Sequence, residues 1–253
     1  MFSLKNKHAV ITGGGSGIGR ATCLLFAKQD AYVHVLDINK DAAEATASEI
    51  KKNGGIAVAH ICDVTNQLNV VEVFNQIGSI NILVNSAGVS HIGNAENTTE
   101  KDFDRVYHVN VKGVYNCLHA VVPVMKKNGG AIVNLCSVAA WAGLSDRFAY
   151  SMSKGAVNAM TLSVAKDYIH NNIRCNSVSP GRVHTPFVDD FLAKNYPGRE
   201  KEMYDKLAKT QPIGRMGTPE EIASVILFLC SDEAAFITGT DYPIDGGFLK
   251  LNT

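Results

Sequence analysis

Short apolar runs alternate with longer helical patterns along most of the chain. The short runs predict strands, and the longer stretches between them predict helices. This alternation is typical of a parallel sheet with helices on both faces, and right-handed crossovers make such a sheet doubly wound. We therefore predict an α/β fold with a seven-stranded parallel sheet. The predicted strands are residues 8–12, 32–37, 56–62, 80–85, 131–137, 173–179 and 241–244, and the predicted helices are residues 16–29, 41–52, 66–77, 101–127, 149–170 and 219–230.

One segment interrupts this alternation. Residues 184–211 are polar and only partly helical, and they lie between a predicted strand and the next regular helix. Ligands bind beyond the carboxyl ends of the strands in such sheets. We therefore interpret the segment as a substrate loop or lid, with an ordinary surface excursion as the alternative.

The composition is that of an ordinary globular protein and argues against several other classes. Hydrophobic residues make up 46% of the 253 residues and charged residues 19%, and no Pro/Gly/Ser-rich linker divides the chain. We therefore predict a single domain over residues 1–253. The formal net charge of zero argues against nucleic acid or an anionic membrane as the main partner. No apolar run reaches the ~18–20 residues of a membrane span.

The cysteines and the N-terminus indicate a reducing compartment. The six cysteines are scattered without a C-x-x-C pair, and most lie in apolar runs, which is usual for reduced core thiols. No histidine/carboxylate cluster has metal-ligand spacing. The N-terminus runs straight into a predicted strand, so we expect no signal peptide. We predict a cytoplasmic protein without a metal site.

A glycine-rich turn follows the first predicted strand. Gly13, Gly17 and Gly19 give the spacing G-x-x-x-G-x-G between a strand and a helix, the context that a dinucleotide-binding turn requires. Glycines let the backbone approach a pyrophosphate closely, and the free N–H groups of the helix N-terminus attract the anion. We predict that this turn, with Ser16 and Ile18 between its glycines, binds the phosphates of a dinucleotide in a Rossmann fold.

The end of the second predicted strand carries the residue expected to select the cofactor. Asp37 lies 18 residues after Gly19, where a carboxylate accepts hydrogen bonds from the adenosine ribose and repels a 2′-phosphate. No arginine lies beside it in the sequence. We therefore predict NAD rather than NADP as the cofactor. The alternative is that Asp37 only caps the following turn.

Two further strand ends are expected to lie at the nucleotide. Asp63 and Val64 follow the third predicted strand, where they would border the adenine. Asn85, Ala87 and Gly88 lie at the end of the fourth, where small residues would let a cofactor lie close over the strand ends.

A tyrosine and a lysine supply candidate acid–base chemistry. Tyr150 and Lys154 lie on one face if their segment is helical, and no other of the eight tyrosines has a lysine four residues later. A tyrosine alone is a poor acid or base near neutral pH, because its unperturbed pKa is about 10. A nearby ammonium group favours the phenolate form. The alternative is an ordinary pair on a surface helix.

Several motifs together resemble those of the short-chain dehydrogenase/reductase family, in its classical subgroup. They are TGGGSGIG, NSAG, HVNVKG, NLCSVA, YSMSK and SPGRVHTP, and they follow the family's order over nearly the whole chain. Ser86 departs from the NNAG that is common in the family. Because serine still forms hydrogen bonds, we expect this departure to tune the site rather than abolish it.

The resemblance implies a role for each of four candidate catalytic residues. Tyr150 would be the general acid/base, and Lys154 would hold the nicotinamide ribose and favour the tyrosine phenolate, so both would also contact the cofactor. Ser137 would hydrogen-bond the substrate oxygen. Asn110 would position a water that links Lys154 to solvent. The implied reaction is reversible hydride transfer between a nicotinamide and a secondary alcohol or ketone.

The resemblance also implies the remaining cofactor contacts and an assembly. Pro180 and Gly181 would shape the backbone near the nicotinamide, Val183 would offer backbone groups to the carboxamide, and Thr185 would offer a hydroxyl. The apolar helix at residues 219–230 corresponds to a subunit contact in this family, so we expect a homotetramer, with a buried core helix as the alternative for this segment.

Arg147, three residues before Tyr150, indicates an acidic substrate. A guanidinium group there can bind a carboxylate in bidentate fashion, with a surface ion pair to Asp146 or another carboxylate as the alternative. The surrounding segment resembles dehydrogenases of small hydroxy acids, including 2-keto-3-deoxy-sugar acids. That group often has an arginine near position 210, where this chain has threonine, so Arg182, Lys194 or His184 is expected to supply the positive charge.

Ser90 and His91 add polar groups that suit a polyhydroxylated substrate. We predict an NAD-dependent dehydrogenase of a sugar acid or small hydroxy acid, active in carbohydrate metabolism. Two alternatives stay open. The first is a 3-oxoacyl-[acyl-carrier-protein] reductase, which normally prefers NADPH, and the second is a non-catalytic NAD-sensing protein.

Overall fold

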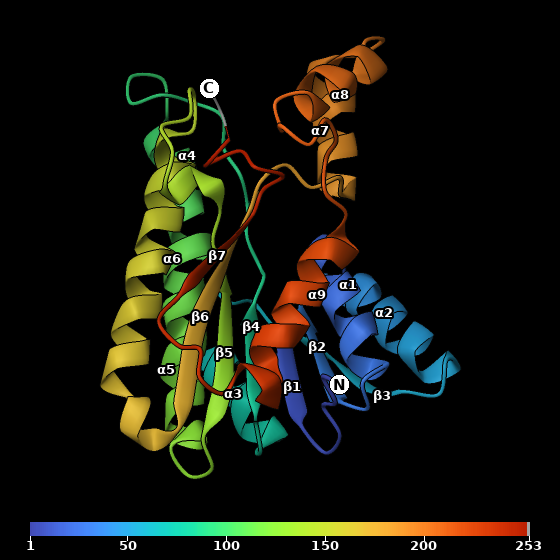
Figure 1. Ribbon diagram of the computed structural model, residues 1–253, viewed down its shortest axis with the longest axis vertical. Coiled ribbons are helices and arrows are strands. Elements are labelled where there is room, and N and C mark those ends of the chain that lie inside the picture. The colour runs from blue at the N-terminus through green and yellow to red at the C-terminus, as the bar shows by residue number, and fades with distance from the viewer. Residues whose placement is uncertain (252–253) are drawn as a thin grey trace.

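Seven parallel strands form one sheet in the order β3-β2-β1-β4-β5-β6-β7 in the computed structural model, which describes residues 1–251 (Figure 1). This confirms the predicted doubly wound α/β fold. The strands are β1 (His8–Thr12), β2 (Tyr32–Asp37), β3 (Ile56–Ile61), β4 (Ile82–Asn85), β5 (Gly130–Leu135), β6 (Ile173–Pro180) and β7 (Asp241–Ile244).

Helices cover both faces of the sheet (Figure 1). One face packs against α1 (Gly17–Ala27), α2 (Lys40–Lys52) and α9 (Pro219–Cys230), and the other packs against α3 (Gln67–Ile77), α5 (Gly113–Met125) and α6 (Phe148–Asp167). Each face therefore has its own apolar core, with Phe26 buried in the first and Phe74 in the second. The remaining helices are α4 (Glu100–Val106), η1 (Tyr107–Lys112), η2 (Val138–Ala140), η3 (Ile169–Asn171), α7 (Pro186–Asn195), α8 (Glu200–Ala208) and η4 (Asp232–Ala234). Within residues 1–251, none of the helices has the length and apolarity needed to cross a membrane.

Local capping fixes where several helices begin. The side chains of Asn39, Asn66 and Thr99 accept hydrogen bonds from backbone N–H groups in the first turns of α2, α3 and α4. Thr218 and Glu221 form a reciprocal capping box at the start of α9. Each cap stabilises its helix by about 1 kcal/mol, because it satisfies a backbone donor that has no partner within the helix.

The order of the strands places a crevice at the carboxyl ends of β1 and β4. β1 pairs with β2 on one side and with β4 on the other, so the connections on either side of β1 leave in opposite directions. Ligands of doubly wound sheets bind at such a switch point. The α7–α8 pair, within the segment expected to be a lid, stands beyond this end of the sheet (Figure 1).

Two elements differ from their predicted form. The stretch predicted as one helix over residues 101–127 consists of α4, the π-helical turn η1 and α5 in succession. The strand predicted over residues 131–137 ends at Leu135, which leaves Ser137 as the N-cap of the 3-10 turn η2. Apolar periodicity reports which face is buried, but it does not register a single extra residue in a helical turn.

Three histidines form a hydrogen-bonded row across β1, β2 and β3. His8 Nδ1 lies 3.2 Å from His34 Nε2, and His34 Nδ1 lies 3.1 Å from His60 Nε2. Burial, followed by the charges of His60 and His8, lowers the pKa of His34 from 6.5 to about 4. The folded protein therefore keeps this imidazole neutral at a pH where the unfolded chain protonates it.

We expect the free energy of unfolding to fall as the pH drops from about 6.5 to about 4. In that range the unfolded chain binds a proton at His34 and the folded chain does not, so acid favours unfolding. Because the ring is partly exposed, we discount the effect to about 1–2 kcal/mol. Urea midpoints of His34→Val should depend less on pH than those of the natural protein, and His170→Gln at an exposed site is the control. Equal pH dependence in all three proteins would contradict this assignment.

Candidate active site

The glycine-rich turn between β1 and α1 has a backbone conformation that favours glycine. Gly13 and Gly17 have φ values of 65° and 51°, and a Cβ atom at Gly19 would collide with the carbonyl oxygen of Gly13. The first N–H groups of α1 have no acceptor within the helix, and the sequence places no acidic residue in its first turn. Ser16, the N-cap, and Ile18 belong to the same turn. The turn therefore fits an anionic group such as the pyrophosphate of a dinucleotide.

Asp37 faces this turn from the end of β2. Its Oδ2 accepts a hydrogen bond from the N–H of Gly15 at 3.0 Å, and its Oδ1 accepts one from the N–H of Asn39 at 2.9 Å. The second of these bonds is a turn cap of the kind considered as the alternative for this residue. Capping does not use up the carboxylate, because each oxygen has a second lone pair for an added hydroxyl.

The cations near this carboxylate are already paired with other acids. Arg20 on α1 forms an ion pair with Glu49 of α2, and Lys40 lies 3.8 Å from Glu44. A 2′-phosphate beside Asp37 would therefore meet a negative charge and arginine and lysine side chains that are engaged elsewhere.

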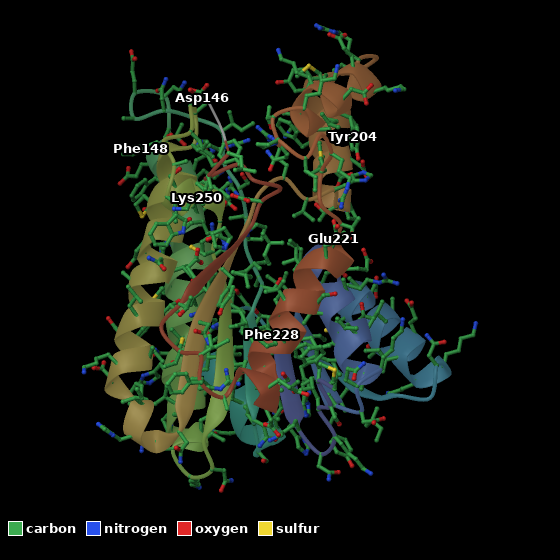
Figure 2. All side chains as sticks on the ribbon, viewed as in Figure 1. Asp146, Phe148, Tyr204, Glu221, Phe228 and Lys250 are labelled. Carbon is green, nitrogen blue, oxygen red and sulfur yellow. The ribbon has the colours of Figure 1, made fainter. Side chains whose placement is uncertain are left out.

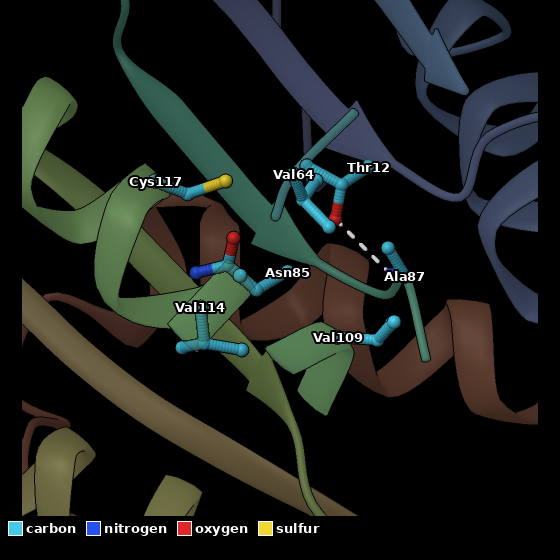
Figure 3. Close-up of a pocket in the computed structure, with 8 residues that line it drawn as sticks. Thr12, Val64, Asn85, Ala87, Val109, Val114 and Cys117 are labelled. Atoms are coloured by element: carbon cyan, nitrogen blue, oxygen red, sulfur yellow. Dashed lines mark hydrogen bonds between the residues drawn. The ribbon is translucent and has the colours of Figure 1, made fainter. Parts of the chain in front are cut away.

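The loop after β4 is fixed by a buried threonine. Thr12 Oγ1 accepts hydrogen bonds from the N–H groups of Ser86 and Ala87, both at 3.1 Å; the bond to Ala87 is drawn in Figure 3. The side chain of Asn85 is buried, 2% exposed, and its Nδ2 donates to Asn134 Oδ1 at 2.8 Å. The side chain of Asn85 therefore links the ends of β4 and β5.

The other predicted cofactor residues lie at neighbouring strand ends. Asp63 Oδ1 accepts hydrogen bonds from the N–H and hydroxyl of Thr65, and the carbonyl of Val64 accepts one from Asn116. These bonds fix the backbone just after β3. Gly88 lies near the catalytic cluster, since a Cβ there would be 3.4 Å from Asn110 Oδ1 and 3.8 Å from Lys154 Nζ.

The segment after β6 approaches the glycine-rich turn. Gly181, just after Pro180 at the end of β6, donates its N–H to Ile244, and Val183 forms an isolated bridge with Gly217. The methyl group of Thr185 lies 3.5 Å from the position of a Cβ at Gly17. The structure thus brings residues 180–185 and 13–19 together over the switch point.

Tyr150 and Lys154 lie one turn apart on α6, as their spacing predicts. Lys154 Nζ is 5.7 Å from the centroid of the Tyr150 ring and donates a 2.7 Å hydrogen bond to the carbonyl of Leu135. The thiol of Cys136 donates to the carbonyl of Lys154, so the end of β5 packs against this face of α6. Ser137, 8% exposed, follows directly. Three candidate catalytic residues therefore meet where β5 and α6 touch.

Asn110 connects this cluster to the loop after β4. It lies in the π-helical turn η1 and is 1% exposed. Its side chain accepts a hydrogen bond from the N–H of Val89 at 2.8 Å and donates to the carbonyl of Val89 and to Ser153 Oγ. Ser153 in turn donates to the carbonyl of Tyr150 at 2.7 Å. Asn110 thus joins the loop and the catalytic turn of α6.

Arg147 is held at the start of α6 by the loop of residues 91–93. Its Nη1 donates to the carbonyl of His91 at 3.2 Å. On either side of it, Gly93 donates its N–H to Asp146 and accepts one from Phe148, both at 3.0 Å. Figure 2 labels Asp146 and Phe148 at the end of α6 next to the carboxyl ends of the strands. These backbone hydrogen bonds thus fix the position of the main chain at Arg147.

Arg182 is the second guanidinium at this end of the sheet. Its Nε donates to Thr210 Oγ1 at 2.9 Å, and it lines a cavity of about 180 Å³ together with Gln211 and residues at the start of α9 and the end of β7. Burial, followed by the positive charge of Arg147, lowers the pKa of Arg182. Within residues 1–251, neither arginine forms an ion pair, so the alternative of a surface pair between Arg147 and Asp146 is wrong.

The other predicted substrate residues are engaged with neighbouring elements. The carbonyl of Ser90 accepts a hydrogen bond from Arg105, and the ring of His91 lies 3.9 Å from Asp102. His184 Nε2 lies 2.7 Å from Asp189 Oδ1 on α7. Its ring also packs against Tyr204 on α8, so this imidazole contacts both α7 and α8.

Sequence reasoning missed Ser153 and Gly93 as parts of the site. Ser153 stands beside Lys154 in YSMSK, so its place in the motif was the available signal. Gly93 has no such signal, because only the folded chain brings it next to residues 146–148. In the described part of the chain, no group of three or more His, Cys, Asp or Glu residues is arranged to hold a metal ion, and the six cysteines are buried and unpaired.

Comparison with known proteins gives matches over nearly the whole chain. The family model described as enoyl-(acyl carrier protein) reductase matches residues 13–249. The 3-oxoacyl-[acyl-carrier-protein] reductase FabG of Thermotoga maritima is 39% identical, over 97% of this chain and 99% of that protein. The 2-keto-3-deoxy-L-fuconate dehydrogenase of Xanthomonas campestris is 34% identical, over 97% of this chain and 81% of that protein. The crystal structure of levodione reductase superposes with a TM-score of 0.93 at 30% identity, covering 98% of this chain and 99% of that one.

Proposed function

Because the chain belongs to the short-chain dehydrogenase/reductase family, we propose that it oxidises the secondary hydroxyl of a sugar acid or other small hydroxy acid with NAD. Membership of the family makes it an NAD(P)-dependent oxidoreductase acting on CH–OH groups. The observation that carries the choice of substrate is that Arg147 and Arg182 each form hydrogen bonds only to uncharged groups and have no carboxylate partner among residues 1–251.

The reaction needs a hydride acceptor and a proton acceptor. When bound, the nicotinamide supplies the hydride chemistry. Tyr150 exchanges the proton with the substrate oxygen, and the ammonium of Lys154 stabilises its phenolate form. Ser137 donates a hydrogen bond to the same oxygen and stabilises the charge that develops there. Asn110 holds the loop after β4 against α6 and positions the water through which Lys154 exchanges protons with solvent.

The preference for NAD rests on Asp37. Its carboxylate is held at the glycine-rich turn by Gly15 and Asn39, where it accepts hydrogen bonds from the ribose hydroxyls of NAD and repels the 2′-phosphate of NADP. Arg20, whose guanidinium would otherwise favour a phosphate, is paired with Glu49.

The substrate carboxylate binds Arg147, with Arg182 as the second positive group. Ser90 and His91 border the substrate on the opposite wall, and the segment 184–211, including His184, covers it. Arg147 is the N-cap of α6, three residues before Tyr150, so a short chain suffices between a carboxylate bound there and the reacting hydroxyl. We further propose that the protein is a cytoplasmic homotetramer of carbohydrate metabolism.

We expect Arg147→Ala to lower kcat/KM for carboxylate substrates by about 10–100-fold, because it removes a charge-assisted hydrogen-bond donor worth about 1.5–3 kcal/mol. Neutral secondary alcohols should be affected by less than about twofold and serve as the internal control. The measurement is NADH formation across a panel of sugar acids, hydroxybutyrates, neutral sugars and simple alcohols. The same panel includes NADPH oxidation with 3-oxoacyl thioesters.

Two results of this panel would overturn the proposal. The first is activity confined to neutral alcohols. The second is activity confined to 3-oxoacyl thioesters with NADPH, which would make the chain an acyl-carrier-protein reductase.

A further inference from the structure

The segment between Ser137 and Tyr150 carries one candidate catalytic residue at each end. It begins with Ser137 as the N-cap of η2, and hydrogen bonds within the turn run from Ala140 to Ser137 and from Trp141 to Val138. It then crosses exposed positions to reach Arg147. The far end is fastened by the two backbone hydrogen bonds of Gly93. The near end needs a fastening of its own.

Trp141 supplies that fastening through its indole N–H. The Nε1 group donates to Asp241 Oδ2 at 2.9 Å and lies 3.2 Å from Ser179 Oγ. The hydroxyls of Ser177 and Ser179 donate to Asp241 Oδ1 at 2.6 and 2.9 Å. One carboxylate at the start of β7 therefore gathers donors from the catalytic turn and from β6.

Asp241 has no cation of its own. Within residues 1–251 it forms no ion pair, and the side chains that donate to it are those of Trp141, Ser177 and Ser179, all neutral. Ser177 and Ser179 are both fully buried. The carboxylate supplies the hydrogen-bond acceptor that their hydroxyls would otherwise lack. A carboxylate that has no cation and accepts a hydrogen bond from Trp141, next to the turn that carries Ser137, indicates a positioning function.

We propose that Asp241 is a positioning residue for the reaction, and that it orients Ser137 by holding Trp141. This inference rests on the proposed role of Ser137 as the donor to the substrate oxygen. β5 fixes the backbone only as far as Cys136, whose N–H donates to Val178. Beyond it, the direction of the serine hydroxyl depends on η2, and the indole is where the end of η2 is held to the sheet.

Asp241→Asn is a selective test, because asparagine keeps an oxygen for the serine hydroxyls but can turn an NH₂ group toward the indole N–H. Trp141→Phe removes the donor from the other side. We expect each variant to lower kcat by about 10-fold, a fraction of the 10²–10³-fold loss seen when an oxyanion donor is deleted outright. The KM for NAD should stay within about twofold.

The decisive readout is the effect in a Ser137→Ala background. If Asp241 acts through Ser137, Asp241→Asn should change kcat of Ser137→Ala by less than about twofold. An equal 10-fold loss in both backgrounds would reduce Asp241 to a structural role. A shift of the pH profile of kcat would instead mean that the carboxylate acts on Lys154. The charges of Lys154 and Asp241 both influence the pKa of the Cys136 thiol, so the two groups lie in one electrostatic environment.

Trp141 also gives a readout that needs no turnover. It is the only tryptophan in the chain and is 52% exposed, so all tryptophan emission comes from the tethered indole. We expect Asp241→Asn to shift that emission to longer wavelength, and Asp232→Asn at an exposed site to leave it unchanged. Unchanged emission and unchanged kcat in Asp241→Asn would overturn the proposal. Full activity of Ser137→Ala would instead overturn the proposed role of the serine.

Discussion

Tyr150→Phe is expected to lower kcat by about 10²–10⁴-fold and to leave NADH binding within about twofold. The phenolic oxygen is the group that exchanges a proton with the substrate, whereas the ring and the turn of α6 that presents it are kept by phenylalanine. Lys154 still donates to Leu135 in the variant, so the local structure does not depend on the lost hydroxyl. Steady-state rates and quenching of protein fluorescence by NADH separate the two effects.

Tyr115→Phe is the matched control, because Tyr115 lies half-exposed on α5 and packs against His119. It should retain full activity. The same comparison decides between an enzyme and an NAD sensor. A Tyr150→Phe protein that binds NADH and keeps turnover would falsify the assignment of Tyr150 as the general acid/base.

The second large effect concerns the choice of cofactor. We expect Asp37→Ala to lower kcat/KM with NAD by about 10–100-fold, because the ribose loses charge-assisted hydrogen bonds worth about 1.5–3 kcal/mol. With NADP the same change removes a repulsion, so kcat/KM should rise. The NAD/NADP ratio should therefore fall by more than the NAD effect alone.

Asp37→Asn distinguishes charge from shape in this experiment. Its side-chain oxygen can still accept the hydrogen bond from Asn39 that caps the turn, but it carries no charge to repel a phosphate. Asp41→Ala, at an exposed position in the first turn of α2, is the control and should leave the ratio unchanged. A natural protein that already prefers NADP, or an Asp37→Ala ratio equal to the natural one, would rule out Asp37 as the selector.

The features that sequence reasoning predicted depend on short spacings within the chain. Alternating apolar runs gave the strands, and the three glycines of the turn and the i, i+4 pair of Tyr150 and Lys154 keep their relation in any helix or turn that contains them. The doubly wound arrangement then followed from the rules for parallel sheets, whereas the strand order comes from the structure. These are local properties, and the fold was predictable for that reason.

The features that were missed depend on residues far apart in the chain. Trp141 and Asp241 are 100 residues apart, and no periodicity relates them. Gly93 meets Asp146 only because two loops cross the same end of the sheet. The π-helical turn around Asn110 was missed for another reason. One extra residue in a helical turn hardly changes the pattern of apolar positions, so the sequence carried no sign of it.

The packing of α9 on α1 has a consequence for how the protein folds during its synthesis on the ribosome. Residues near the two ends of the chain share one apolar core, in which Phe26 of α1 and Ile226 of α9 are both buried, and the ring of Phe2 lies against Phe228. At about 5–20 residues per second, α1 is made about 10–40 seconds before α9. Through that interval the nascent chain exposes an uncovered apolar face. We therefore expect the growing chain to rely on chaperones, and a stop codon before residue 219 to send the product to proteolysis.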